Sequence, residues 1–300
     1  MTASSPGENR TSTIRKVDYA PPAGHSAGAE VADLATLLRR AGPAEFQAPQ
    51  RLGFELVLQI RSGRTSHEVD FTSYSLGPGD VFWIHAGQVH RWGDISAIDG
   101  PVLMLPPDLY DEATAHLFRR LGISHLNHWP GAASPGSLLW ESFSTTAEID
   151  QRLRSAPALE AEARDQALTH AVLATLLVLA GSNPAGRGPI RPRNEVFSWF
   201  EEEIEKSFQR ERTVAGYARR LGYSERTLNR LARAHAGTTA KELIDRRVVL
   251  EAKRRLIHET VPIVEIADRL GFEDAANFSK FFSHRTGTTP SAFRTASRPG

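Results

Sequence analysis

One segment occurs twice near the C-terminal end of the sequence. The first copy begins at Ala218 with Ala-Arg-Arg-Leu-Gly-Tyr-Ser and ends with Gly-Thr-Thr at Thr239. The second begins at Ala267 with Ala-Asp-Arg-Leu-Gly-Phe and ends with the same three residues at Thr289. The offset is 49 residues up to the turn glycine and 50 after it, which indicates one supersecondary unit used twice. Each copy has the pattern of a helix-turn-helix unit, an apolar helix, a glycine turn and a helix with a charged outer face.

The second helix of each copy carries the residues that would meet DNA. In a helix-turn-helix unit this helix enters the major groove, where arginine reads guanine and asparagine reads adenine. The first copy places arginines and an asparagine opposite its leucines, whereas the second copy turns phenylalanines inward and keeps fewer polar residues outside. The residues predicted to contact DNA are Arg226, Asn229, Arg230, Arg233, Ala276, Asn277 and Lys280.

The two copies are unequal in what they offer to a base. Arg226, Asn229 and Arg230 equip the first copy to read bases by hydrogen bonds, while Ala275 and Ala276 of the second copy offer only methyl groups, which can touch thymine. The first copy is therefore expected to discriminate between DNA sequences more strongly than the second, which would depend more on Asn277, Lys280 and phosphate contacts.

Charge is divided unevenly along the chain. The 300 residues carry a formal net charge of +1, but residues 206–300 hold 19 Lys and Arg against 10 Asp and Glu, a net charge of +9. The remainder has a net charge of −8. This division of charge indicates that the basic C-terminal third binds a polyanion and that the acidic remainder does not. A solvated helical surface can carry the same excess of basic residues. The chain has no cysteine, which excludes disulfides and thiolate metal sites.

Short strands separated by glycine and proline turns are predicted in the N-terminal half. They cover 54–60, 67–74, 81–84, 89–92 and 102–105. This spacing is typical of an antiparallel sandwich or barrel.

Helical periodicity precedes and follows these strands. The predicted helices cover 31–40, 111–121, 138–155 and 158–180. The last of them places Leu168, Val172, Leu176 and Leu179 on one stripe, which suits either a core or a dimer seam.

Four motifs in the C-terminal third resemble the signature of the AraC/XylS family. They are Val249-Leu-Glu-Ala-Lys-Arg-Arg-Leu256, Ile263-Val-Glu-Ile-Ala-Asp-Arg-Leu-Gly-Phe272, Asn277-Phe-Ser-Lys-Phe-Phe282 and Thr286-Gly-Thr-Thr-Pro-Ser-Ala-Phe-Arg294. The resemblance covers residues 195–296 and implies a seven-helix domain that reads adjacent major grooves of a double-stranded DNA operator. It also implies an N-terminal domain that binds a small-molecule effector and forms a homodimer, with RNA polymerase as a further candidate partner.

The segment 78–90 resembles the second half of the cupin motif, which belongs to a small jelly-roll barrel. The expected fold class is therefore α+β, with a cupin-like antiparallel β-barrel and a helical dimerisation segment before an all-α domain of two helix-turn-helix units. The expected divisions are a disordered tail (1–17), a cupin-like effector-binding and dimerisation domain (18–182), a linker (183–193) and a DNA-binding domain (194–300).

Polar and aromatic residues in and beside the predicted strands are candidates for an effector pocket. They are Arg61, His67, Trp83, His85, His90 and Trp92. Trp83 and Trp92 suit a plain apolar core equally well.

A cupin metal site combines a His-x-His pair, a glutamate and a third histidine, and only His90 has a match at the required position. Glu68 and Val69 follow His67, so the His-x-His pair is missing. We predict no metal and no cofactor, and the alternative is a three-histidine site formed by His67, His85 and His90.

These observations favour a sequence-specific DNA-binding transcription regulator that senses a small molecule and is not an enzyme. Two alternatives stay open, a metal-dependent cupin enzyme fused to a DNA-binding module and a DNA binder without an effector. The polar N-terminal residues lack the apolar core of a signal peptide, and the longest apolar run, 171–181, is too short to cross a membrane. The cytoplasm and no membrane partner are therefore expected.

Overall fold

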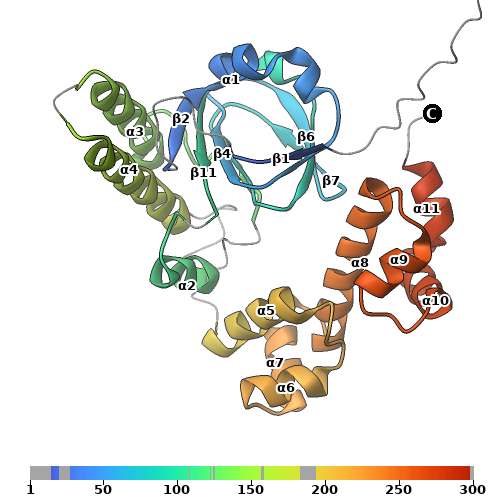
Figure 1. Cartoon of the computed structure of the whole chain (residues 1–300). Coiled ribbons are helices and arrows are strands. Elements are labelled where there is room, and N and C mark those ends of the chain that lie inside the picture. Colours follow the sequence, from blue (N-terminus) through green and yellow to red (C-terminus); the bar gives the residue numbers. More distant parts are fainter. Residues whose placement is uncertain are drawn as a thin grey trace, which may run out of the picture.

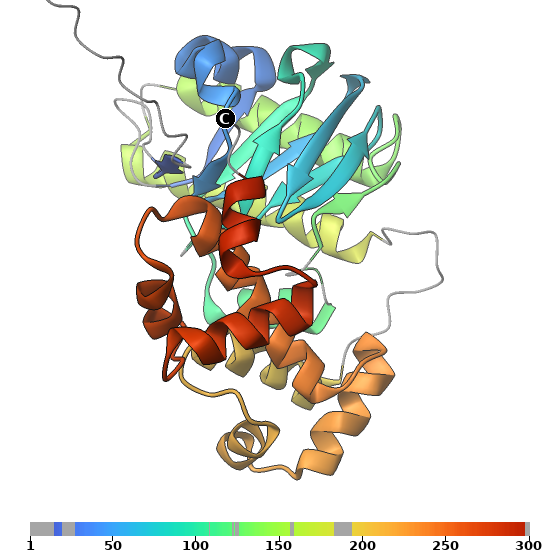
Figure 2. The same ribbon diagram turned by 90° about the vertical axis from the view of Figure 1, so that its right-hand side faces the viewer.

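The computed structural model describes residues 15–19, 28–107, 109–121, 123, 126–156, 159–182 and 194–297. Figures 1 and 2 show an N-terminal half of strands and helices beside a C-terminal half built from helices alone. The α+β organisation predicted from the sequence is confirmed. Residues 1–14 of the predicted tail and the whole predicted linker, 183–193, lie outside the described residues.

Two five-stranded sheets form the N-terminal half. The strands are β1 Arg15–Val17, β2 Glu30–Asp33, β3 Gln50–Leu52, β4 Glu55–Gln59, β5 Ser62–Gly63, β6 Thr65–Val69, β7 Thr72–Leu76, β8 Val81–Ile84, β9 Val89–Trp92, β10 Ile98–Asp99, β11 Pro101–Leu105 and β12 His128–Trp129. The first sheet has the order β1-β3-β9-β6-β7, with only β1 and β3 parallel. The second sheet, β12-β8-β4-β11-β2, is antiparallel throughout, and β5 pairs separately with β10.

The two sheets enclose an apolar core. Because successive side chains of a strand point to opposite faces, Leu56 and Leu58 of β4 join Leu52 and Trp92 of the first sheet in this core. Val57 lies between the two leucines and packs in the other direction, against helices. The second sheet is thus covered on both faces, which explains why β4 and β8 are buried along their whole length.

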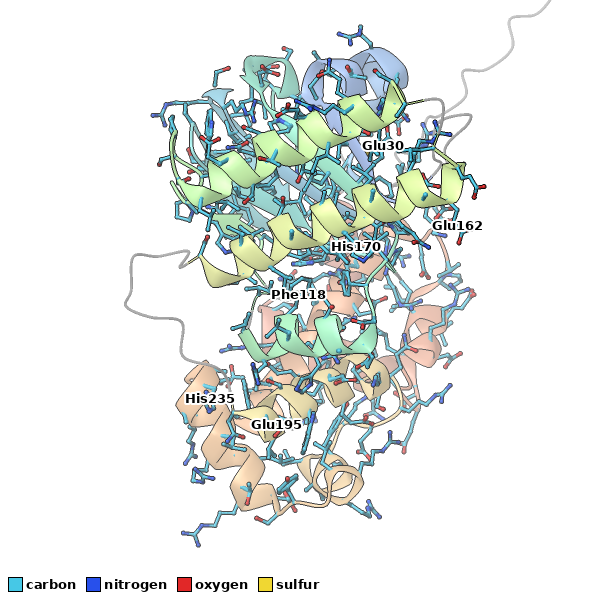
Figure 3. The ribbon with its side chains drawn as sticks, turned by 90° about the vertical axis from the view of Figure 1, so that its left-hand side faces the viewer. Glu30, Phe118, Glu162, His170, Glu195 and His235 are labelled. Carbon is cyan, nitrogen blue, oxygen red and sulfur yellow. The ribbon has the colours of Figure 1, made fainter. Side chains whose placement is uncertain are left out.

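The helices 138–154 and 161–181 cover the outer face of the second sheet, as Figure 3 shows, and Phe118 of the helix beside them joins the same core. The helices of this half are α1 Leu34–Ala41, α2 Glu112–Leu121, α3 Leu138–Arg154 and α4 Ala161–Gly181, with short 3-10 helices η1 Pro43–Phe46 and η2 Ile95–Ala97. The stripe predicted on α4 is buried and serves as core between α3, α4 and the sheet. Thr146 of α3 and Thr175 of α4 hydrogen-bond at 2.8 Å inside this helix pair.

Three N-terminal predictions were wrong in detail. The predicted helix 31–40 is divided between β2 and α1, which begins after the N-cap residue Asp33. The last residues of the predicted tail, Arg15–Val17, form β1 and pair with β3. The predicted single strand 67–74 is a hairpin, in which Asp70 and Phe71 connect β6 to β7. Neither residue is a glycine or proline, and a single aspartate followed by phenylalanine is only a weak turn signal.

The described part of the C-terminal half contains seven helices, as the family resemblance implies. They are α5 Glu195–Ser207, α6 Val214–Leu221, α7 Glu225–Ala236, α8 Ala240–His258, α9 Ile263–Arg269, α10 Ala275–Thr286 and α11 Pro290–Ala296. Helices α5 to α8 and α10 each follow an N-cap residue whose side chain accepts a hydrogen bond from the backbone N–H three residues further on. These caps are Asn194, Thr213, Ser224, Thr239 and Asp274.

Helix α8 connects the two helix-turn-helix units, α6–α7 and α9–α10. Its residues Ile244, Val248, Ala252 and Leu256 are buried in one apolar core with residues of both units. Figure 1 shows α8 between the two groups of helices. Among the described residues, no helix is both long and apolar enough to span a membrane.

Candidate functional site

The outer face of α7 is a row of exposed arginines. Ser224 caps the helix, and Leu228, Leu231 and Ala232 are buried, so the opposite face is left to solvent. Arg226, Arg230 and Arg233 lie on that face and are exposed. Among the residues that the structure describes, no carboxylate forms an ion pair with any of them. Their guanidinium groups therefore remain available for bases or phosphates.

The corresponding face of α10 carries less charge. Asp274 caps this helix, and Phe278 and Phe282 hold it in the core. Ala276, Asn277 and Lys280 are exposed on the outer side. The Nδ2 atom of Asn277 donates to Oδ2 of Asp274 at 3.0 Å, which leaves Lys280 as the long cationic side chain of the three.

Asn229 differs from the other predicted contacts because its amide is already engaged. Its Nδ2 atom donates to the carbonyl of Glu225, and its Oδ1 atom accepts from the backbone N–H of Ala240, both at 3.1 Å. Ala240 is the first residue of α8, where backbone N–H groups lack a partner inside the helix. Asn229 thus braces α7 against α8, and a base contact by this residue stays a prediction.

Direct contacts fix the second unit against the rest of the C-terminal half. The Nη2 atom of Arg212, which precedes α6, donates to the carbonyl of Leu270 at 2.7 Å, and its guanidinium lies 3.4 Å from the ring centroid of Phe272. Gly271 has a φ of 72°, and a Cβ atom there would come within 2.0 Å of the Gln209 carbonyl oxygen. On α8, the buried Asp245 pairs with Arg285 of α10. The two units therefore share one rigid frame.

The six predicted ligand residues do not meet in one pocket. His67, His90 and Trp92 lie in the core between the sheets. Trp83 and His85 lie at the boundary with the C-terminal half. Arg61 lies at the other end of the second sheet, where its Nη2 atom donates to Ser144 Oγ at 2.8 Å and its guanidinium lies 4.9 Å from the Trp140 ring.

His67 and His90 form a buried pair. The Nε2 atom of His67 lies 3.2 Å from Nδ1 of His90, and their rings are stacked. Burial lowers the pKa of His90 to about 3, and burial together with the neighbouring His90 lowers the pKa of His67 well below 6.5. Both rings are therefore neutral. Among the described residues, the second nitrogen of each ring and Nε1 of Trp92 are buried without a hydrogen-bond partner.

His85 belongs to a different cluster, so the three histidines do not form one site. Its Nδ1 atom lies 3.0 Å from Oε2 of Glu55, and its Nε2 atom lies 2.9 Å from the carbonyl of Leu126. Trp83 Nε1 donates to the same carboxylate oxygen of Glu55 at 2.6 Å. In the described part of the chain, no three histidines or carboxylates are grouped as metal ligands.

Electrostatics bind Glu55 and His85 together. Burial alone would raise the pKa of Glu55 and lower that of His85, since it penalises the charged forms. Their mutual attraction and hydrogen bond reverse both effects, so the pKa of Glu55 is lowered and that of His85 is raised. The pairing therefore favours the charged forms of both side chains.

A cavity of about 650 Å³ opens beside this pair, between the second sheet, α2, α5 and α8. Glu55, His85 and Tyr110 line it from the N-terminal half, while Ser198 and Arg254 line it from the C-terminal half. The Ser198 hydroxyl is buried and has no partner among the described residues. The cavity therefore offers polar groups from both halves of the chain.

Sequence reasoning missed the residues that organise this boundary. Glu55 is an acidic residue at the start of a buried apolar strand, and that isolation was the available signal. Asp70 and Arg254, which meet across the boundary, carry no such signal, because charged residues are ordinary in turns and on helices.

Two family models match the chain. A model described as "Helix-turn-helix domain" matches residues 217–296, and one described as "AraC-like ligand binding domain" matches residues 35–178.

Relatives of both parts are found among known proteins. The probable transcription factor PqrA of Proteus vulgaris is 30% identical over 101 residues, which cover 34% of this chain and 81% of PqrA. The HTH-type transcriptional activator RhaS of Pectobacterium carotovorum is 24% identical over 250 residues, covering 80% of this chain and 85% of RhaS. Among solved structures, that of ToxT from Vibrio cholerae covers 82% of this chain and 90% of its own at 14% identity, with a TM-score of 0.39.

Proposed function

This chain belongs to the AraC family of DNA-binding transcription regulators with an N-terminal ligand-binding domain, and we propose that its two helix-turn-helix units divide the work of operator recognition. The first unit reads the base sequence through Arg226 and Arg230 of α7. The second unit anchors the protein through Lys280 of α10 and through phosphate contacts. Arg233, Ala276 and Asn277 are the flanking positions.

The difference between the two outer faces carries this proposal. On α7, three exposed arginines have no carboxylate partner among the described residues, whereas the matching part of α10 exposes Ala276 and a single lysine. Arginine can bond bidentately to guanine, but a lysine acts as a point charge and an alanine only touches a thymine methyl group. Base discrimination should therefore be concentrated under α7.

The proposed effector is a small molecule held by the N-terminal half. The boundary cavity supports this, because a ligand there would touch Glu55 and Tyr110 of one half and Ser198 of the other. A ligand that contacts both halves can favour one relative arrangement of them, which is what regulation requires. The candidates Trp83 and His85 lie at this cavity, while His67, His90, Trp92 and Arg61 lie away from it.

We also propose that the N-terminal part, residues 18–182, forms a homodimer through the helix pair α3–α4. Leu138 of α3 is 71% exposed and Leu177 of α4 is 43% exposed. The pair lies on the side of the N-terminal half away from α8–α11 (Figure 1). RNA polymerase and a cytoplasmic location are further proposals, supported by relatives that are named as transcription regulators.

A binding selection with the full-length chain and randomised double-stranded DNA tests the function. Enriched sites should contain two half-sites about 10 base pairs apart, with stronger base preference in the half-site under α7. The matched control is the chain with Arg226 and Arg230 both changed to alanine, which should bind weakly and without preference in that half-site. Failure of the unaltered chain to enrich any sequence would contradict the proposal.

A further inference from the structure

The turn between β6 and β7 reaches from the first sheet to the C-terminal half. It consists of Asp70 and Phe71, whose φ angles are 46° and 69°. Two-residue turns with this backbone are usually built from asparagine and glycine, because a β-carbon is crowded in the left-handed region. A bulky residue such as Phe71 persists there only where its surroundings hold it.

Arg254 of α8 holds the first residue of this turn. Its Nε atom donates to Oδ1 of Asp70 at 2.8 Å, and its Nη2 atom donates to Oδ2 at 2.6 Å. Both side chains are largely buried, with 8% of Arg254 and 11% of Asp70 exposed. The N–H of Val89 and the amide of Gln88 also donate to the Asp70 carboxylate. A bidentate pair of this kind fixes orientation as well as distance.

Phe71 makes a second contact beside the ion pair. Its ring centroid lies 5.9 Å from that of Phe293 in α11, in an edge-on arrangement. The Nζ atom of Lys253 lies 5.4 Å from the Phe71 centroid and 5.7 Å from the Phe293 centroid. Both residues of the strained turn therefore contact the C-terminal half, Asp70 through Arg254 and Phe71 through Phe293 and Lys253.

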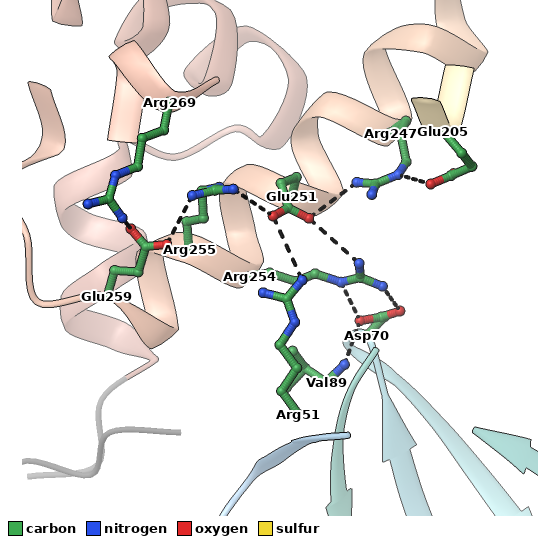
Figure 4. A network of polar contacts seen from close by, with 10 residues as sticks. All are labelled: Arg51, Asp70, Val89, Glu205, Arg247, Glu251, Arg254, Arg255, Glu259 and Arg269. Atoms are coloured by element: carbon green, nitrogen blue, oxygen red, sulfur yellow. Dashed lines mark hydrogen bonds and ion pairs between the residues drawn. The ribbon is translucent and has the colours of Figure 1, made fainter. Parts of the chain in front are cut away.

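A wider ionic network continues from Arg254 along α8, as Figure 4 shows. Glu251 is buried and lies 3.7 Å from Arg254, 3.4 Å from Arg247 and 3.2 Å from Arg255. Arg51 of β3 approaches Glu251 to 4.0 Å from the first sheet. Of these pairs, Asp70–Arg254 has the closest geometry across the boundary.

The turn is also tied to the interior of the first sheet. The N–H of Asp70 donates to the carbonyl of Val89 at 2.8 Å, and the preceding Val69 is paired in register with His90. His67 lies on the same strand, three residues before Asp70. A shift of β6 against β9 would therefore move the Asp70 carboxylate relative to α8.

We propose that Asp70 and Arg254 form a latch that sets the orientation of the C-terminal half against the first sheet. In the latched state, the β6–β7 turn holds α8 in place. When the sheet shifts, the carboxylate leaves the guanidinium and the C-terminal half reorients. The inference rests on the proposed function, because the half that moves is the one that carries α7 and α10. A ligand drives this change to the extent that it binds the two arrangements with different affinities.

Distance measurements on the full-length chain test the latch. Because the chain has no cysteine, spin labels can be placed at two introduced cysteines alone, Glu141→Cys on α3 and Ser291→Cys on α11. In this background, Asp70→Asn removes the charge, while asparagine still accepts from Val89 and tolerates a positive φ. The variant Arg254→Gln removes the other partner, and Asp70→Arg with Arg254→Asp reverses the pair. Arg246→Gln is the matched control, since it removes an arginine–glutamate pair of α8 within the C-terminal half.

The labelled chain is mixed with an excess of unlabelled chain, so that a dimer carries one labelled copy, and we expect one narrow distance distribution for the unaltered pair and for the Arg246→Gln control. Either single change at the latch should broaden the distribution and shift its mean, and the reversed pair should recover part of the narrow component. Identical distributions for Asp70→Asn, Arg254→Gln and the control would overturn the latch. DNA binding is measured on the same samples. If the unaltered chain binds no DNA, the proposed function fails, and the distances still decide the latch.

Discussion

Asn229 joins the first recognition helix to α8 by accepting a hydrogen bond from the backbone N–H of Ala240 at 3.1 Å. The same side chain donates to the carbonyl of Glu225 one turn earlier in α7. Asn229 could bind a base by its chemistry, but in this structure its amide holds helix α7 in position against α8. The neighbouring Arg230 is exposed and free to read.

Replacing Asn229 by alanine should therefore affect stability more than base preference. The change leaves the Ala240 N–H without its side-chain acceptor, which costs about 1 kcal/mol of unfolding free energy. Chemical denaturation measures this loss, and a binding selection measures the preference. Selected sites that lose one specific adenine, with unchanged stability, would show that Asn229 reads a base instead.

Replacing Arg230 by alanine should relax the preference in one half-site. Loss of a bidentate arginine–guanine contact costs about 1–3 kcal/mol at that position. Lys280→Ala on α10 is the comparison, and it should weaken binding to all sequences to a similar extent while lowering the salt dependence. Selection on randomised operators measures both, and equal loss of preference in the two half-sites would refute the division of labour.

Acidification should destabilise the N-terminal half through the His67–His90 pair. The folded pKa of His90 is about 3 and that of His67 is well below 6.5, so the unfolded chain binds more protons as the pH falls. The stability is fully present above pH 6.5 and is lost as the pH falls toward 3. One such histidine contributes a loss of about 2 kcal/mol at pH 5. The free energy of unfolding, measured from pH 7 to pH 5, should fall with decreasing pH. The variant His90→Gln should show a smaller fall.

His85 should act in the opposite sense. Its pKa is raised by Glu55 after burial is overcome, so its contribution is fully present below pH 6.5 and is lost as the pH rises through the raised value. The Glu55 partner has a lowered pKa, so its contribution is present above about pH 4.5 and disappears at lower pH. His85→Gln should flatten the alkaline side of the stability profile and leave the slope from the buried pair. An unchanged alkaline side would contradict the ion pair.

Replacing Leu177 by glutamate should weaken self-association. A leucine that is 43% exposed on α4 loses contact with water if α3 and α4 meet a second copy, and a buried carboxylate would oppose that contact. We expect the dimer dissociation constant to rise by about tenfold or more, measured by analytical ultracentrifugation. The control Arg152→Gln changes a charged residue at the exposed end of α3 and should leave association intact. A wholly monomeric unaltered chain would refute the dimer.

The C-terminal half could be predicted almost completely from the sequence, because its signals are local. A cap such as Ser224, a turn glycine such as Gly222 and the buried Leu228 lie within a few residues of one another and act within one helix-turn-helix unit. Each of these features depends on backbone geometry over one or two helical turns. Because the segment occurs twice, the same local signals are present in both units.

The contacts of the N-terminal half were harder to predict, because the residues that meet there are far apart in the sequence. His67 meets His90 through the pairing of β6 with β9, and Glu55 meets His85 through β4 and the end of β8. Strand pairing is set by the whole fold. The sequence alone therefore does not show which of the aromatic and charged candidates lie in the same site. The turn at Asp70 was missed for a related reason, because its compensation comes from α8 and α11.

The contact between Arg212 and the Leu270–Phe272 turn has a consequence for the evolution of the target DNA. This contact holds the turn before α10 against the segment before α6, so the length of DNA between the contacts of α7 and α10 is expected to match a fixed separation within the protein. A single inserted base pair would rotate one contact by about 35° around the DNA axis. On the proposed division of labour, we therefore expect binding sites to vary in base composition under α10 far more freely than in length.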